Sequence, residues 1–342
     1  MTRIDTNETR VAYGKAGECQ VTPTAILVHD PVAAGAMDVF QGRGNQPDAA
    51  HELLFREGPD IEHYATQHRA LVDELRSQVA HVWYLSELVG DLPGFTATAT
   101  NPNHVFTRDA LITLPWVPDG YICSNMKRTL RRDEWRLLAT AVERLGLTEI
   151  VRLPDDVILE GGDVIPFVWG GRRILFVGVG RRSNFRALEF LRSALILEFA
   201  DEIIGIELAD WRMNLDGGFV PVAVDVLVCD TDSILGAWRM DQRGPARLDL
   251  WKMLDEMGIR VIDTPREESV YAQSCNCLCV GERRIVYYDL CPRVAEQLRQ
   301  HDIDVRLVPG SELVKGRGGP RCLTRPIYLP VDEMLISDGL VR

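Results

Sequence analysis

Short polar motifs recur along this chain at similar distances, each ahead of a unit that combines β-rich runs with a helix. They are Phe-Thr-Arg-Asp ending at Asp109, Glu-Gly-Gly-Asp ending at Asp163, Asn-Leu-Asp ending at Asp216 and Ser-Cys-Asn around Asn276. The intervals between these four positions are 54, 53 and 60 residues. A period near 55 residues predicts a ring of similar units whose polar residues gather at one end.

Helical and β-rich segments alternate, which predicts an α/β or α+β fold. Amphipathic helices are expected at residues 60–80, 132–145, 183–200, 245–257 and 292–301, and β-rich runs at 25–28, 104–114, 173–179, 219–229 and 284–288. Five helices imply five units. No Pro/Ser-rich linker interrupts the chain, so we expect a single domain over residues 1–342, with a core from about residue 20 to residue 330.

The charge balance narrows the choice of partners. The chain has 342 residues, with 38 Lys and Arg against 50 Asp and Glu, a net charge of −12. An acidic chain is poorly suited to neutralising phosphates, so we expect no nucleic-acid partner, whereas a small cationic substrate is compatible with this charge. The sequence leaves open whether the chain forms a homo-oligomer.

The chain shows no sign of a membrane or a secretory route. No run approaches 18 uncharged apolar residues, so no membrane span is expected. The first ten residues lack the apolar core of a signal peptide. We therefore expect the eight cysteines to be reduced and the protein to be cytoplasmic.

Cys322 lies at the end of a glycine-rich loop, Lys-Gly-Arg-Gly-Gly-Pro-Arg-Cys at residues 315–322. The glycines let the backbone approach a neighbour closely. Arg317 and Arg321 would stabilise a thiolate, which is the nucleophilic form of cysteine. A glycine-rich surface turn beside a buried cysteine is the alternative interpretation.

Several carboxylates precede the predicted β-rich runs. Glu160 and Asp163 flank two glycines, and paired carboxylates hold a planar guanidinium by bidentate hydrogen bonds. Asp109 is a further carboxylate, and Asn214 and Asp216 share one face of an extended segment. Taken singly, each motif is explained as simply by an acidic turn or a polar strand end.

Together and in this order, the motifs resemble those of the guanidine-modifying enzyme (pentein) superfamily, and most closely its arginine deiminase branch. That family carries Asn-x-x-Phe-Thr-Arg-Asp, then Glu-Gly-Gly-Asp, then His-Leu-Asp, then Gly-Arg-Gly-Gly-Pro-Arg-Cys, and the last motif matches throughout residues 316–322. The resemblance extends from about residue 25 to residue 326. It implies an α/β fold, a five-bladed α/β propeller with pseudo-fivefold repeats, and an enzyme without a cofactor or metal. We also expect a central acidic pocket.

The resemblance also implies roles for individual residues. The Cys322 thiolate would attack the guanidinium carbon and form a covalent thiouronium intermediate. Asp109 and Asp216 would hold the guanidinium nitrogens, and Glu160 would orient the catalytic base or the substrate. The remaining residues matched to substrate binding are Asp163, Arg182, Arg131 and Arg317, of which Arg182 and Arg131 match positions that bind a substrate carboxylate.

One position departs from the family pattern. Asn214 stands where the family has its general acid/base histidine, and an amide does not titrate near pH 7. Three explanations are open for this missing histidine: another group of the protein replaces the base, the substrate supplies its own base, or the protein has lost the ability to hydrolyse its substrate. His29 and His104 lie nearest to the matched motifs and are the first candidates for a replacement. The sequence therefore predicts a hydrolase acting on arginine or a derivative, with an amidinotransferase or a non-catalytic guanidine-binding protein as alternatives.

Three further cysteines lie close together. Cys275, Cys277 and Cys279 are expected to alternate along one strand, but they lack the Cys-x₂-Cys spacing of zinc sites. We therefore expect no metal centre there.

Overall fold

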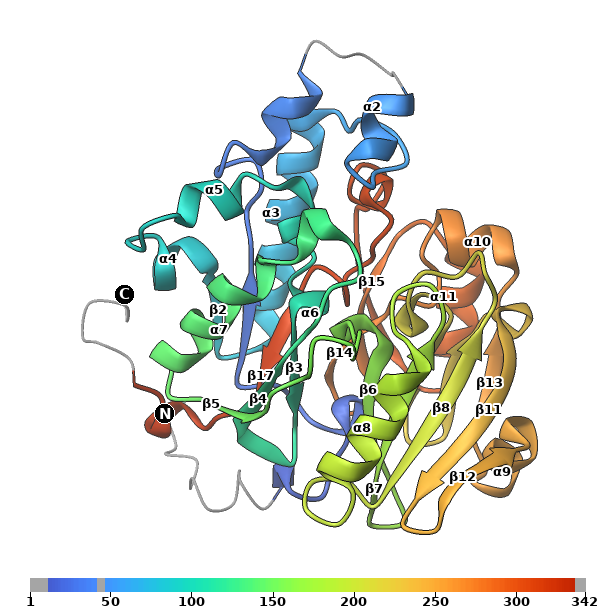
Figure 1. Ribbon diagram of the computed structural model, residues 1–342. Coiled ribbons are helices and arrows are strands. Elements are labelled where there is room, and N and C mark those ends of the chain that lie inside the picture. The colour runs from blue at the N-terminus through green and yellow to red at the C-terminus, as the bar shows by residue number, and fades with distance from the viewer. Residues whose placement is uncertain (1–11, 42–46, 336–342) are drawn as a thin grey trace.

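The computed structural model describes residues 12–41 and 47–335, and within them the strands form five sheets of one shared design (Figure 1). Each sheet contains an antiparallel pair, and a third strand runs parallel to one member of that pair. Parallel neighbours need a crossover connection, and in every sheet the crossover contains a helix. The expected alternation of strands and helices is confirmed.

The first sheet joins segments that are far apart in the sequence. Its strands are β17 (Arg325–Ile327), β1 (Ala25–Val28) and β2 (His81–Tyr84), with β1 antiparallel to β17 and parallel to β2. The crossover helices are α2 (Pro47–Glu52) and α3 (Ile61–Gln78). The Asp60 side chain caps α3 by accepting a hydrogen bond from the main-chain nitrogen of His63, so this helix begins at the first residue after the cap.

The second and third sheets follow directly along the chain. The second consists of β3 (Leu111–Leu114), β4 (Val117–Cys123) and β5 (Thr148–Val151), with α7 (Glu134–Arg144) in its crossover. The third contains β6 (Val164–Trp169), β7 (Arg172–Val179) and β8 (Glu202–Leu208), with α8 (Phe185–Leu195) in its crossover. A hairpin of β11 (Ile234–Asp241) and β12 (Gly244–Leu248) extends the third sheet beyond β8.

The last two sheets repeat the same design. The fourth consists of β9 (Phe219–Ala223), β10 (Val226–Cys229) and β13 (Arg260–Asp263), with α9 (Leu250–Glu256) before β13. The fifth consists of β14 (Leu278–Gly281), β15 (Arg284–Tyr288) and β16 (Asp304–Val308), with α11 (Pro292–Arg299) in its crossover. The shorter helices are α4 (Leu85–Val89), α5 (Phe95–Ala99), α6 (Thr107–Ala110) and α10 (Arg266–Tyr271).

The polar motifs precede the first strands of the sheets, as their spacing predicts. Asp109 lies in α6 just before β3, Asp163 before β6, Asp216 before β9 and Asn276 before β14, while Cys322 lies in a turn before β17. Neighbouring motifs contact one another in sequence order, and the main-chain nitrogen of Arg108 closes the series by donating to the Cys322 carbonyl. The sheet design therefore brings five distant motifs to one place.

Three expected elements differ in the structure. The expected strand at residues 104–114 is a strand only from Leu111, because Asn101 and Pro102 start a 3-10 helix that leads into α6. The expected helix at 245–257 begins only at Leu250, because residues 244–248 pair with β11. The expected run at 219–229 is a hairpin of two strands.

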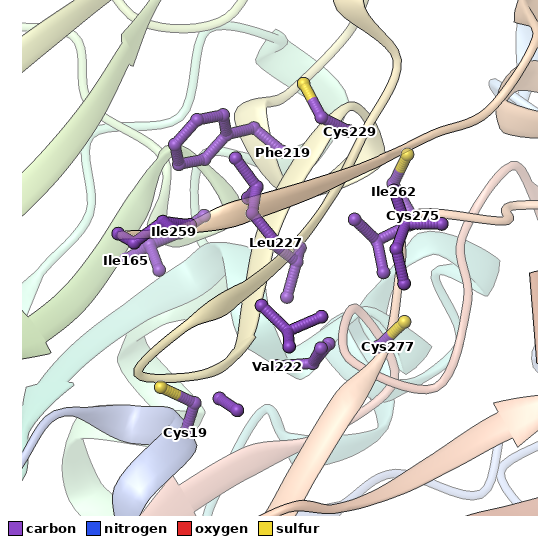
Figure 2. Packing of buried hydrophobic residues seen from close by; sticks show 14 of the residues in the cluster. Cys19, Ile165, Phe219, Val222, Leu227, Cys229, Ile259, Ile262, Cys275 and Cys277 are labelled. Carbon is purple, nitrogen blue, oxygen red and sulfur yellow. The ribbon is translucent and has the colours of Figure 1, made fainter. Parts of the chain in front are cut away.

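A large apolar cluster packs between the third, fourth and fifth sheets (Figure 2). It contains Cys229, Cys275 and Cys277 beside aliphatic residues such as Leu227 and Ile262. Only Cys279 of the three neighbouring cysteines lies in β14, so the expected alternation along one strand is wrong. Burial raises the pKa of Cys275 to about 12, as expected for a thiol in an apolar core.

The described part of the chain contains no helix with the length and apolar character that a membrane span requires.

Candidate active site

The glycine-rich loop before β17 is shaped by two close neighbours. A Cβ atom added at Gly316 would lie 2.7 Å from the Phe106 ring, and one at Gly319 would lie 2.7 Å from the Asn276 side chain. The expected close approach of the loop backbone is therefore confirmed. Phe106 and Asn276 belong to two of the polar motifs, so the loop is fitted against its neighbouring units.

Asn276 holds the nucleophile candidate in place. Its Oδ1 accepts hydrogen bonds from the main-chain nitrogens of Cys322 (3.0 Å) and Gly319 (3.2 Å). Its Nδ2 donates to the Cys322 Sγ at 3.1 Å and to the Asp216 carbonyl at the same distance. One buried amide thus fixes both the loop and the sulfur.

The Cys322 thiol is only 8% exposed, and Sγ donates a hydrogen bond to the Asp216 Oδ2 at 3.4 Å. Burial raises the pKa of Cys322 well above its usual range, and the carboxylates of Asp216 and Asp109 raise it further. Arg321, expected to stabilise the thiolate, instead pairs with Asp216 and Glu18. The raised pKa favours the protonated thiol over the thiolate.

Two carboxylates converge above Gly162. A Cβ atom there would lie 2.5 Å from the Asp109 Oδ1 and 3.3 Å from the Asp216 Oδ1, so only a glycine leaves both oxygens in place. The Asp109 Oδ1 is buried without a hydrogen-bond partner, whereas its Oδ2 accepts from Arg131 at 2.7 Å. Oxygens so close to one point can share one planar cation.

The Glu160 and Asp163 carboxylates form a second buried group. Asn214 Nδ2 donates to the Glu160 Oε2 at 3.2 Å and to the Asp163 Oδ2 at 3.1 Å. Arg182 pairs with Glu160 at 3.1 Å, and the Ser183 hydroxyl donates to Asp163 at 2.5 Å. Asn214 therefore links the two carboxylates, but it carries no titrating group between them.

Arg131 is not free to bind the carboxylate of a substrate, because it is buried and already paired with two carboxylates of the protein. It is 3% exposed and pairs with Glu134 at 2.7 Å as well as with Asp109. Although Arg131 opposes the effect, burial raises the pKa of Glu134 to about 7. The role of Arg131 toward a substrate carboxylate stays a prediction, and this pairing does not favour it.

A cavity of about 300 Å³ opens beside the sulfur and is lined by Cys322, Asn214 and Asp216. A smaller cavity, also lined by Cys322, has Asp109, Arg131 and Arg182 among its lining residues, and Arg317 borders both cavities. The expected acidic pocket is wrong: in the described chain the larger cavity has one acidic lining residue, Asp216, against four arginines. These are Arg56, Arg181, Arg212 and Arg317.

The histidines expected to replace the missing base lie away from this cavity. His29 and His104 are buried and stack edge to face at 4.9 Å between ring centroids. Both ring nitrogens of His104 lack a hydrogen-bond partner, and burial lowers its pKa well below the usual value. Among the described residues, His51 is the histidine that lines the larger cavity.

Two residues of this region were not assigned a role from the sequence. Asn276 carried a signal, because it lies in the fourth recurring polar motif. Glu18 carried none: it forms buried ion pairs with Arg108 at 3.2 Å and Arg321 at 2.8 Å, both far from it in the sequence. Although burial raises its pKa, the two arginines outweigh that effect and bring the pKa of Glu18 down to about 2.

In the residues that the structure describes, no group of three His, Cys, Asp or Glu side chains could hold a metal ion.

Comparison with known proteins connects this geometry to a family. The family model described as arginine deiminase matches residues 97–328. The arginine deiminase of Staphylococcus epidermidis is 43% identical over 67 residues, which are 20% of this chain and 16% of that protein. The arginine deiminase of Staphylococcus aureus (strain Newman) is 43% identical over 68 residues, with the same two shares. The match thus spans only 16% of the length of these curated relatives.

Solved structures show the fold over a much longer stretch. The N-terminal domain of ArgZ, a cyanobacterial arginine dihydrolase, aligns with a TM-score of 0.65 and 21% identity, covering 90% of this chain and 99% of that domain. DDAH from Pseudomonas aeruginosa, in complex with citrulline, aligns with a TM-score of 0.63 and 18% identity, covering 89% and 99%. The chain has the mixed α/β fold of these pentein structures, and the resemblance seen in its motifs is confirmed.

Proposed function

This chain belongs to the arginine deiminase family, and from that premise we propose that it is a cysteine-dependent hydrolase acting on the guanidino group of arginine or an arginine derivative. The observation that carries the proposal is that Cys322 lines two adjoining cavities, with Asp216 in the larger one and Asp109 in the smaller one, while both carboxylates approach Gly162. A buried thiol beside two convergent carboxylates suits attack on a small planar cation.

The substrate guanidinium would lie between the two carboxylates above Gly162. The unpartnered Asp109 Oδ1 and the Asp216 Oδ1 are the acceptors we assign to it. Because Asp216 Oδ2 is 3.4 Å from the Cys322 Sγ, a cation held by Asp216 would present its central carbon to the sulfur. This placement supplies the proximity that a nucleophilic step requires.

Substrate binding itself would activate the thiol. The Asp216 and Asp109 charges raise the pKa of Cys322, and a bound guanidinium compensates both charges. The thiol proton would pass to a nitrogen of the guanidinium as the sulfur–carbon bond forms. In hydrolysis the carbon–nitrogen bond to that nitrogen then breaks, which releases ammonia and leaves a thiouronium on Cys322. Water attacks the same carbon, the carbon–sulfur bond breaks and the thiol is restored. The carbon leaves as a ureido group, and one proton passes to solvent.

Asn214 supports a second candidate function, amidino transfer. The second half of the hydrolytic reaction needs a base to activate water, and the amide of Asn214 cannot supply one. An incoming amine is a better nucleophile than water and would take the amidino group from Cys322 with less assistance. A guanidine-binding protein without turnover remains the third possibility raised by this position.

The experiment that tests these functions combines product analysis with intact-protein mass spectrometry. The protein is mixed with L-arginine, and citrulline, ornithine and ammonia are measured while a mass increase at Cys322 is sought. Adding glycine as an amine acceptor tests transfer. For the parent protein we expect a Cys322 adduct and slow product release, because Asn214 cannot act as a base. Asn214→His restores the family residue and should accelerate hydrolysis.

A matched pair of cysteine variants supplies the control. Cys322→Ser should abolish adduct and turnover. Cys291→Ser should leave both unchanged, because Cys291 is the N-cap of α11, a position where serine is favoured. Full turnover in Cys322→Ser would contradict the mechanism. Guanidine binding without adduct or turnover in the parent protein would favour the non-catalytic reading.

We also propose that the five sheets close into a five-bladed propeller and that the chain forms one catalytic domain. The closed series of contacts among the five motifs supports the propeller. All eight cysteines are free, which supports a reducing compartment such as the cytoplasm. The expectation that the protein has no nucleic-acid partner stays a prediction. Whether the chain forms a homo-oligomer stays open.

A further inference from the structure

The wall of the larger cavity is unusually basic for a chain with a net charge of −12. Its four arginines come from four separate segments of the sequence, and Asp216 is the single carboxylate among the described lining residues. Arg212 is compensated, because it pairs with Asp230 at 2.6 Å. The remaining three arginines have no such partner in the described part of the chain.

These three arginines, Arg56, Arg181 and Arg317, form no ion pair with any carboxylate in the described part of the chain. Arg56 donates to the main-chain carbonyl of Val270 at 2.7 Å. Arg317 keeps a buried Nε without any hydrogen-bond partner. Burial and the charges of Arg181 and Arg182 lower the pKa of Arg317, so these cations repel one another.

Arg317 is held in a backbone conformation that favours glycine. Its φ is +70°, in the left-handed region, although glycines lie on either side of it. A glycine at this position would avoid the strain. An arginine that is strained, partly buried and lacking partners points to a ligand that needs its charge.

The two adjoining cavities therefore offer groups of both charges. Asp216 in the larger cavity and Asp109 in the smaller one can take a guanidinium. The three arginines of the larger cavity have no carboxylate partner in the described chain and can bind anionic groups. One carboxylate of free arginine would leave most of that charge unmatched, and its α-ammonium group would add repulsion. Resting on the proposed function, we propose that the substrate is a guanidino compound whose far end carries at least two negative charges and no free ammonium group.

A matched ligand pair tests this specificity. Nα-glutaryl-arginine carries two carboxylates, and its glutaryl amide has nearly the same size with one fewer negative charge. Binding to the Cys322→Ser protein is measured by calorimetry, so that turnover does not interfere. We expect the diacid to bind about tenfold or more tightly than the amide, with a difference that shrinks as salt is added.

Two variants assign the effect to the proposed residues. Arg181→Gln and Arg317→Gly should each reduce the preference for the diacid, while Arg306→Gln, an exposed arginine paired with Asp304 on β16, should keep it. Arg317→Gly also suits the backbone, so its melting temperature should not fall. A lost preference therefore reports a lost charge and not misfolding.

The outcomes separate this inference from the proposed function. If arginine forms a Cys322 adduct but the diacid and the amide bind equally, the dianionic substrate is wrong and the hydrolase stands. If glutarate, which has no guanidino group, competes with the diacid in the parent site but not in Arg317→Gly, the anion subsite stands even without turnover. Equal binding of all three ligands to the parent and both arginine variants would overturn the inference.

Discussion

Gly162 sits where the two guanidinium-binding candidates meet, so it is the most sensitive small residue of the site. In Gly162→Ala the new methyl group would lie 2.5 Å from the Asp109 Oδ1 and would displace that carboxylate. We expect kcat/KM for the guanidino substrate to fall about 100-fold or more, because a misplacement of about 1 Å has that effect. Steady-state kinetics measure the loss.

Gly236→Ala is the matched control for that change. Its methyl group would also approach a carboxylate oxygen, the Glu207 Oε2 at 2.9 Å, but outside both cavities. Activity in this variant should stay close to that of the parent. Equal activity in the two variants would mean that Asp109 does not hold the substrate.

The state of the Cys322 sulfur leads to a second prediction. Because burial and Asp216 raise its pKa, iodoacetamide should alkylate Cys322 in the free protein more slowly than it alkylates glutathione at pH 7.5. Asp216→Asn removes one of the charges that disfavour the thiolate, so labelling should accelerate. Peptide mass spectrometry follows the rate at Cys322, and faster labelling of the parent than of glutathione would disprove a protonated thiol.

Among the loops that precede the first strands, the link between Asn276 and the Cys322 loop matters most. Asn276→Ala would leave the main-chain nitrogens of Cys322 and Gly319 without their acceptor. A buried unsatisfied group typically costs about 1–3 kcal/mol, so the free energy of unfolding should fall by that order and turnover should drop with it. Urea unfolding and steady-state kinetics measure the two effects.

Asn125→Ala is the control that distinguishes a loss of folding stability from a loss of positioning of the Cys322 sulfur. Asn125 donates to the carbonyls of Pro154 (2.8 Å) and Val157 (2.9 Å) and lines neither cavity. Its loss should lower stability while the folded protein keeps its kinetic constants. If Asn276→Ala behaves in the same way, Asn276 supports the fold without positioning the sulfur.

The sequence predicts elements well where local pattern and tertiary pairing agree. The bounds of β1 and β15 match the expected runs, because both are short apolar stretches rich in β-branched or aromatic residues. The strand expected from residue 104 is wrong at its start, because a 3-10 helix follows Asn101. The Asn-Pro pair at residues 101–102 is a helix start signal that indicates this helix. The late start of α9 had no local signal, since only pairing with β11 makes residues 244–248 a strand.

Across the whole molecule, three buried histidines predict a loss of stability in acid. Burial lowers the pKa of His29 to about 4, and it also lowers the pKa of His68 and His104. Between pH 6.5 and pH 4 the unfolded chain therefore binds more protons than the folded one, so folding weakens as the pH falls through this window. For His29 alone the loss from pH 8 to pH 5 is on the order of 2 kcal/mol.

Urea unfolding at pH 8 and pH 5 measures this loss. His104→Gln should reduce the difference between the two pH values, whereas the exposed His63→Gln should leave it unchanged. Glu134, whose pKa burial raises to about 7, acts in the opposite sense but equally in both variants. An unchanged pH difference in His104→Gln would mean that His104 takes up its proton in the folded protein as readily as in the unfolded chain.

The order of the motifs and the glycines around Cys322 could be read from the sequence, because each serves a local backbone need. The basic wall of the cavity could not. Arg56, Arg181 and Arg317 lie far apart in the chain and meet only through the arrangement of the sheets. The pairing of Arg131 with Glu134 could not be predicted either, because the sequence does not distinguish Arg131 from Arg128 and Arg132 nearby.

The antiparallel pairing of β1 with β17 has a consequence for how the protein is made. A ribosome delivers β1 early, and its partner arrives only after about three hundred more residues have been synthesised, a process of many seconds. Until then β1 lacks its antiparallel partner, and the Cys322 turn, which directly precedes β17, has not yet been synthesised. A partly synthesised chain therefore lacks the candidate nucleophile, and the proposed chemistry toward guanidines would begin only once synthesis has passed the final strand.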